Sequence, residues 1–176
     1  MEIISESSAT AVINASIESI DLTEWVFTLK SHEYQACSTG HIAAGSSISA
    51  DGKRMSINVE QVAGNLLVQN YIEEIGKRDH CRLNSISDSF SDSGRTKLGV
   101  IWELKVEKLT PNSCQFTNLV KVLMTDEFSS MLRSAGITDL SPIKAGMSEN
   151  VSLHNQEETP LFAKDIERKA HSGVWK

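Results

Sequence analysis

The sequence predicts an α+β domain in which an antiparallel sheet packs against one long helix near the C-terminus. Three observations support this prediction. A strand and a short helical region open the chain, six strand-like segments follow over residues 41–124, and a long helical run over residues 141–172 comes last. The turns between the six segments are too short for parallel crossovers, so consecutive strands must pair as antiparallel hairpins. A sheet that curls around the helix would bury the apolar side of that helix.

The N-terminal part of the chain contains the first strand and one or two short helices. Residues 1–8 are expected to be loose, whereas residues 9–15 are rich in β-branched side chains, which predicts a strand. Asp21 can cap a helix over residues 22–29, and a second short helix or turn is expected over residues 31–37.

Six further strands are expected to form a meander. They are predicted over residues 41–49, 54–62, 66–75, 80–90, 97–109 and 114–124. Asp51-Gly52 is typical of a two-residue hairpin turn, and Gly, Asn, Ser or Pro occupy the other connections. A short helix over residues 126–135, closed by Gly136, links the last strand to the C-terminal helix.

The C-terminal helix is predicted over residues 141–172. Ser141 suits the N-cap and Pro142 suits the first helical position, where its missing N–H costs nothing. Gly173 suits the position just beyond the end of the helix, and residues 173–176 are expected to be loose.

Two features interrupt this helix. Pro160 removes a backbone donor, which predicts a kink or break near residues 157–159. The apolar side of the helix, followed in steps of four residues, carries Asn155 and Thr159 in place of carbon. Such a polar gap is consistent with a helix that lies against a cavity and not against a solid core.

Composition limits the classes of function. A chain of 176 residues without a break in composition is expected to form one domain over residues 1–176. The net charge of -6 and the scattered basic residues make nucleic acid and anionic membranes poor partners. The three cysteines lack the spacing of a disulfide framework or a zinc knuckle, and neither an export signal nor a membrane span is recognisable, so we expect a cytoplasmic protein with reduced thiols.

Alternation along the strands predicts which side chains face the helix. In the strand over residues 97–109, the alternate residues from Leu98 to Val106 are apolar and are expected inside. In the strand over residues 114–124, the expected inward set includes one polar residue, Asn118.

Two other strands give less one-sided patterns. In the strand over residues 54–62, three apolar side chains are expected inside, so the polar residues that alternate with them, Glu60 included, are expected to face solvent. In the strand over residues 66–75, two apolar sets compete for the inner face. One choice turns Asn70 inward and the other turns Gln69 inward.

These inward polar groups would give a mostly apolar cavity with a few hydrogen-bonding groups, which is the usual composition of a small-molecule pocket. The alternative is that each amide is satisfied by backbone or buried water, and that the aromatic residues only fill the core. The predicted pocket residues are Trp25, Asn70, Tyr71, Trp102, Phe116, Asn118, Met147, Val151, Asn155 and Thr159.

The sequence contains no recognisable motif for a metal, nucleotide or other cofactor, so none is predicted. His41 and Cys37 lie four residues apart, but Thr39-Gly40 would break a helix between them, which argues against a shared metal. His154 could carry a proton near neutral pH, although a position at the helix edge is the simpler interpretation. His154 and Glu60 are the candidate catalytic residues.

The order of elements resembles the helix-grip fold of the START-like, polyketide cyclase-like (SRPBCC) superfamily. Locally, Ala11-Val12-Ile13-Asn14-Ala15-Ser16, followed by a helix that carries Trp25, is similar to the opening of that superfamily. The family often has Ala-Pro where this chain has Ala15-Ser16, and the first helix here begins several residues later. The resemblance implies a curved seven-stranded sheet around the C-terminal helix, with an internal pocket between them.

The resemblance and the polar gap in the long helix together favour a protein that binds a small, mainly hydrophobic molecule. One alternative is an enzyme similar to polyketide cyclases or hydratases, acting on an aromatic or polyketide-like substrate with His154 or an acid as proton carrier. A second alternative is a regulatory or protein-interaction module with a vestigial pocket. Formation of a homodimer is left open.

Overall fold

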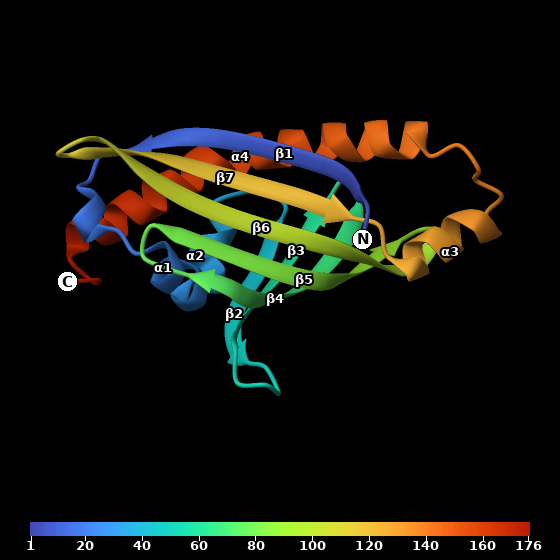
Figure 1. Ribbon diagram of the computed structural model, residues 1–176, viewed down its shortest axis with the longest axis horizontal. Helices are drawn as coiled ribbons and strands as arrows, with labels where there is room; N and C mark the ends of the chain where they lie inside the picture. The colour runs from blue at the N-terminus through green and yellow to red at the C-terminus, as the bar shows by residue number, and fades with distance from the viewer.

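The computed structural model describes residues 1–176 and contains one seven-stranded antiparallel sheet curved around a long helix (Figure 1). The strands are β1 (Ile3–Ile13), β2 (His41–Ile48), β3 (Arg54–Val62), β4 (Asn65–Gly76), β5 (His80–Ser91), β6 (Gly94–Thr110) and β7 (Ser113–Leu123). The helices are a 3-10 turn η1 (Ile17–Ser19), α1 (Leu22–Thr28), α2 (Ser31–Gln35), α3 (Asp126–Ser134) and α4 (Ser141–Ser172). The predicted fold class and order of elements are confirmed.

The strand order is β1-β7-β6-β5-β4-β3-β2, so β2 to β7 form the predicted meander and β1 returns to pair with β7. The long helix α4 packs mainly along β1, and α2 packs on β2 at the opposite edge of the sheet. No helix combines the length and the apolar character that a membrane crossing requires.

The main hydrophobic core lies between the second half of α4 and the sheet. Phe162 is fully buried there, and the centroid of its ring lies 5.0 Å from that of Trp25, 5.9 Å from that of Trp102 and 6.5 Å from that of Tyr34. All buried residues of α4 lie from Asn155 onward. The first half of the helix is therefore held less closely against the sheet.

A smaller hydrophobic cluster forms where α3 packs on β6 and β7. It consists of Ile4, Leu98, Val122, Phe128 and Leu132, and Met147 and Val151 of α4 pack against it while remaining partly exposed. The two clusters are separate, and the first half of α4 bridges the region between them.

The helix α4 continues through Pro160 without a break, and its two halves are inclined to each other in Figure 1. The hydroxyl of Thr159 donates to the carbonyl of Asn155 at 2.5 Å, one turn earlier, a contact that often bends helices. Of the two predicted outcomes, a kink or a break, the structure therefore has the kink. At its start, Leu140 takes the N-cap position that was predicted for Ser141.

Both chain ends are more ordered than predicted. β1 begins at Ile3, earlier than predicted. Its inner face carries the small polar residues Ser5 and Ser7, which are buried but give no hydrophobic signal in the sequence. At the C-terminus, Gly173 has the expected left-handed conformation with φ of 71°, and Trp175 then packs against the main core. The interpretation of residues 1–8 and 173–176 as loose is therefore wrong.

The predicted inner faces of β6 and β7 are confirmed, since Leu98, Trp102 and Asn118 are all buried. On β3 the assignment is reversed, with the polar side chains inside and the apolar ones on the half-exposed outer face. Alternation separates the two faces of a strand but does not show which face is buried. On β3 the polar set, Ser56, Asn58 and Glu60, can be buried because its members find hydrogen-bond partners. Ser56 bonds to Asn58, and Glu60 bonds to Gln69 on the neighbouring strand.

Replacement of Phe162 by Ala should strongly destabilise the fold, because it removes a fully buried ring from the centre of the aromatic core. We expect Phe162→Ala to lower the free energy of unfolding by about 3 to 5 kcal/mol. The control Leu153→Ala alters an exposed position on the same helix and should change it by less than about 0.5 kcal/mol. Urea denaturation followed by circular dichroism measures both, and similar values for the two variants would contradict this account of the core.

Candidate functional site

A cavity of about 310 Å³ lies between the first half of α4 and the inner faces of β3, β4, β6 and β7. Its walls are mainly apolar and include Val100 of β6 with Met147 and Val151 of α4. Ala63 in the turn between β3 and β4 and Pro142 at the start of α4 also border it, and both are exposed. The cavity therefore opens between that turn and the beginning of the helix.

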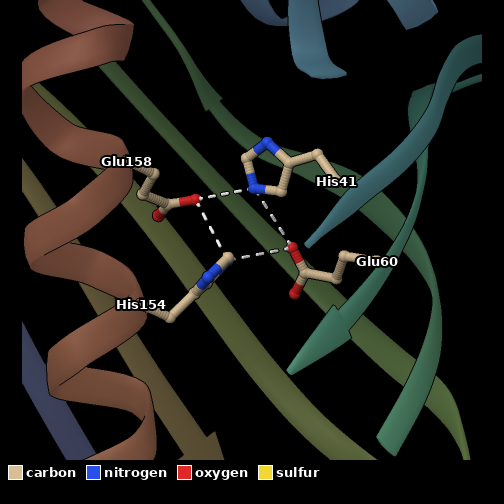
Figure 2. A group of neighbouring side chains, drawn as sticks. All are labelled: His41, Glu60, His154 and Glu158. Atoms are coloured by element: carbon tan, nitrogen blue, oxygen red, sulfur yellow. Dashed lines mark hydrogen bonds and ion pairs between the residues drawn. The ribbon is translucent and has the colours of Figure 1, made fainter. Parts of the chain in front are cut away.

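Two histidines and two glutamates meet at the buried end of this cavity: His41, Glu60, His154 and Glu158 (Figure 2). Nε2 of His41 lies 3.1 Å from Oε2 of Glu158 and 3.6 Å from Oε2 of Glu60. Nε2 of His154 lies 3.4 Å and 3.3 Å from the same two oxygens. Glu60, His154 and Glu158 line the cavity, and the side chain of His41 is fully buried. We call these four residues the His–Glu cluster.

Local structure explains how the four side chains converge. His41 begins β2 at a register shift next to Ala43 and is the cross-strand partner of Glu60 on β3. Gly40 precedes it, and a Cβ at that position would collide with the backbone carbonyl of Gln61, so glycine allows β2 to approach β3. His154 and Glu158 lie four residues apart, so they share one face of α4.

A second layer of hydrogen bonds holds the two carboxylates. The phenol of Tyr34 donates to Oε2 of Glu60 at 2.7 Å, and the amide of Gln69 donates to Oε1 of Glu60 at 2.9 Å. The amide of Asn118 donates to Oε1 of Glu158 at 2.9 Å. One oxygen of each carboxylate, Oε2, is therefore the atom that faces the histidines.

The second layer also orients His41. Its Nδ1 lies 2.8 Å from the backbone carbonyl of Tyr34, and its ring stacks on the ring of Tyr34 with centroids 3.6 Å apart. Because a carbonyl oxygen can only accept, Nδ1 carries the proton of this hydrogen bond. In the neutral imidazole, Nε2 then presents a lone pair to the centre of the cluster.

Burial and neighbouring charges shift the protonation of the cluster in opposite directions. Burial disfavours the charge on His154, but the hydrogen bond to Glu60 and the negative charge of Glu158 outweigh it and raise the pKa of His154 to about 9. Burial also disfavours the Glu60 anion, yet its hydrogen bond to His154 keeps its pKa below the usual value. Burial raises the pKa of Tyr34 well above its usual value, so this phenol remains a donor.

The structure brings together part of the predicted site. The predicted pocket residues that line the cavity are Tyr71, Trp102, Met147, Val151 and Asn155. Both candidate catalytic residues, Glu60 and His154, line the cavity as well. Glu60 therefore does not face solvent, and His154 does not lie at an exposed edge of the helix, as the simpler interpretations of the sequence had it.

The remaining predicted pocket residues do not reach the cavity. Those buried beside or behind its wall are Trp25, Phe116, Asn118 and Thr159. Asn70 lies on the outer face of β4, because Gln69 and Tyr71 occupy the inner one. The sequence left open which face of this strand points inward, and in the structure it is the face that carries Gln69.

Three residues of the site were missed in the sequence: His41, Glu158 and Tyr34. One signal was present, since the spacing of His154 and Glu158 places both on one helical face. The register of the β2–β3 hairpin does not by itself pair His41 with Glu60, because that pairing depends on the register shift between His41 and Ala43. Nothing in the sequence brings these two pairs together, since that depends on how α4 crosses the sheet.

No protein-family model matches this sequence, and no curated protein matches it at the sequence level. Solved structures with a similar fold do match. The Zhui aromatase/cyclase from Streptomyces sp. R1128 has a TM-score of 0.64 at 10% identity, over 93% of this chain and 94% of that chain. A conserved protein from Geobacillus kaustophilus has a TM-score of 0.51 at 8% identity, over 95% of each chain.

A third similar structure is the di-domain ARO/CYC BexL from the BE-7585A biosynthetic pathway. It has a TM-score of 0.51 at 10% identity, over 93% of this chain and 50% of that chain. The chain thus shares the fold of these proteins, a curved antiparallel sheet around a long C-terminal helix, which is the helix-grip fold predicted from the order of its elements.

The second layer can be tested at Asn118, whose amide donates to Glu158 and whose oxygen accepts from the indole of Trp102 at 2.9 Å. Asn118→Asp keeps the shape and the oxygen but places a second carboxylate against Glu158. We expect the free energy of unfolding at neutral pH to fall by about 3 kcal/mol.

The matched control for Asn118→Asp is Asn84→Asp. Asn84 also donates to a glutamate, Glu74, but at a half-buried position on the outer face of the sheet with Arg82 beside it, so the expected change is below about 1 kcal/mol. Chemical denaturation of both variants measures the difference. Equal stability of the two would mean that Glu158 does not depend on the amide of Asn118.

Proposed function

We propose that this protein binds a small, mainly apolar molecule in the cavity between α4 and the sheet, with a polar end of the ligand directed at the His–Glu cluster. The observation that carries this proposal is the composition of the cavity, which has mainly apolar walls and the buried His–Glu cluster at one end. Its volume of about 310 Å³ is at the lower end of the usual range for small-molecule sites.

An unsatisfied acceptor supports a ligand that carries a hydroxyl or another donor. Gln69 is buried and lines the cavity, and its Nε2 donates to Glu60. Its Oε1 is buried without a hydrogen-bond partner in the protein. Buried polar atoms are nearly always paired, and because this oxygen has almost no accessible surface, a donor on the ligand would pair with it after the Gln69 side chain turns towards the cavity.

Filling the cavity with a larger side chain should abolish binding. Val151 lies in the cavity wall, so Val151→Trp places an indole in the space that the ligand would occupy. With the neutral apolar dye Nile red as the probe, we expect affinity to fall by at least about tenfold. Fluorescence titration measures the affinity.

Leu153→Trp is the matched control, because it adds the same side chain to an exposed position of α4. It should leave the affinity for Nile red unchanged. A wild-type protein that does not bind Nile red, or one whose binding survives Val151→Trp, would contradict the proposed function.

A second candidate function is acid–base catalysis on a bound molecule. The specific observation in its favour is that His154 lines the cavity while lying between two carboxylates, an arrangement suited to moving a proton to or from a ligand. The similar fold of an aromatase/cyclase makes small polyketide-like or aromatic compounds reasonable substrates to assay.

The catalytic candidate predicts that His154→Ala lowers turnover on such a substrate panel by about 10² to 10⁴ fold. Leu153→Ala, one residue away and exposed, should retain wild-type turnover. Product analysis by liquid chromatography and mass spectrometry measures both, and undiminished turnover by His154→Ala would remove His154 from this role.

A further inference from the structure

Each histidine of the His–Glu cluster lies close to both carboxylates. Each histidine Nε2 lies near both glutamate Oε2 atoms, at four distances from 3.1 to 3.6 Å. Hydrogen bonds pair His41 with Glu158 at 3.1 Å and His154 with Glu60 at 3.3 Å. Both are longer than the usual charge-assisted N–H···O bond of about 2.7 to 2.9 Å, and the other two close contacts have no hydrogen between them.

From this geometry we infer that the His–Glu cluster is a binding site for one divalent transition-metal ion, ligated by Nε2 of His41, Oε2 of Glu60, Nε2 of His154 and Oε2 of Glu158. Bonds of about 2.0 to 2.1 Å to a tetrahedral ion place neighbouring ligand atoms roughly 3.3 to 3.4 Å apart. The four nitrogen–oxygen distances bracket this value. The nitrogen–nitrogen and oxygen–oxygen separations are at most 4.8 Å, so small side-chain movements would bring all four ligand atoms onto one ion.

The charges of the cluster fit a divalent ion. Two buried carboxylates carry two negative charges, and buried charge is costly unless it is compensated. A divalent cation that displaces the proton of His154 is ligated by two neutral imidazoles, and the site is then neutral overall. Nitrogen and carboxylate oxygen donors suit Zn²⁺, Fe²⁺, Mn²⁺ or Co²⁺, and a site of four protein ligands is typical of Zn²⁺.

The second layer is of the kind found around metal ligands. Metal-bound histidines usually donate their other ring N–H to a carbonyl or carboxylate, and ligating carboxylates are hydrogen-bonded in turn. His41 donates from Nδ1 to a backbone carbonyl, Glu60 accepts from Tyr34 and Gln69, and Glu158 accepts from Asn118. These bonds hold the ligand atoms in place before any ion arrives.

An ion could reach this site through the cavity, because three of the four ligands line its wall. The ion would then lie at the polar end of the proposed ligand site, where an oxygen donor of a bound molecule could add to its coordination sphere. The metal site itself rests on protein ligands alone and does not depend on the proposed binding function.

The test is metal uptake by the full-length protein after chelator treatment. We expect titration of the metal-free protein with Zn²⁺, monitored by isothermal calorimetry, to show that each chain binds one ion with submicromolar affinity. His41→Ala, His154→Ala and Glu158→Gln should each weaken binding by about 100-fold or more. Titration with Co²⁺ should give the visible absorption of a four-coordinate ion in wild type.

His80→Ala is the matched control, because His80 also pairs with a glutamate, Glu103 at 2.8 Å, but on the outer surface of the sheet. It should bind Zn²⁺ as wild type does. Thermal denaturation with and without Zn²⁺ tests binding even in a variant that is less stable than wild type, because an ion that binds the native state raises the melting temperature. The rise should occur in wild type and His80→Ala and be absent in His154→Ala.

Two results would overturn the inference. One is that the stripped wild-type protein takes up none of Zn²⁺, Fe²⁺, Mn²⁺ or Co²⁺ stoichiometrically. The other is that the His41, His154 and Glu158 variants bind the ion as tightly as His80→Ala. Failure of the proposed apolar ligand site is distinguishable, because Val151→Trp removes Nile red binding without altering any of the four metal ligands.

Discussion

The burial of two carboxylates, Glu60 and Glu158, is the constraint on which the interior of this protein depends. An isolated buried carboxylate would cost several kcal/mol, so each needs donors and a compensating positive charge. The donors come from separate elements: Tyr34 from α2, Gln69 from β4 and Asn118 from β7. The inward-facing amides of Gln69 and Asn118 are therefore partners of the carboxylates and are not gaps in an otherwise apolar core.

The buried carboxylate of Glu158 lies where two parts of α4 with different roles meet. The second half carries Phe162 and Ile166 into the aromatic core and fixes the helix to the sheet. The first half presents Met147 and Val151, which remain partly exposed and border the cavity. Asn155, Glu158 and Thr159 lie where these halves meet, so the polar gap in the helix coincides with the change from packed core to cavity.

This division places a polar centre at the closed end of an apolar space. Electrostatic interactions are stronger in such surroundings than in water, since little solvent is present to screen them. Three residues of the His–Glu cluster come from β3 and α4, which also form the cavity wall. His41 comes from the edge strand β2, which does not line the cavity, and is held by Tyr34 of α2. The shape of the cavity and most of its chemistry therefore depend on the same elements.

The sequence by itself determined the element order, the antiparallel meander and the inner faces of β6 and β7, because turn residues and hydrophobic alternation are local signals. It also marked Asn155, Thr159 and His154 as unusual. Tertiary structure alone decided that the polar face of β3 lies inside, and that α4 crosses the sheet where His154 and Glu158 meet His41 and Glu60. The physical reason is that alternation cannot reveal which polar groups will find partners across the core, because those partners are far apart in the chain.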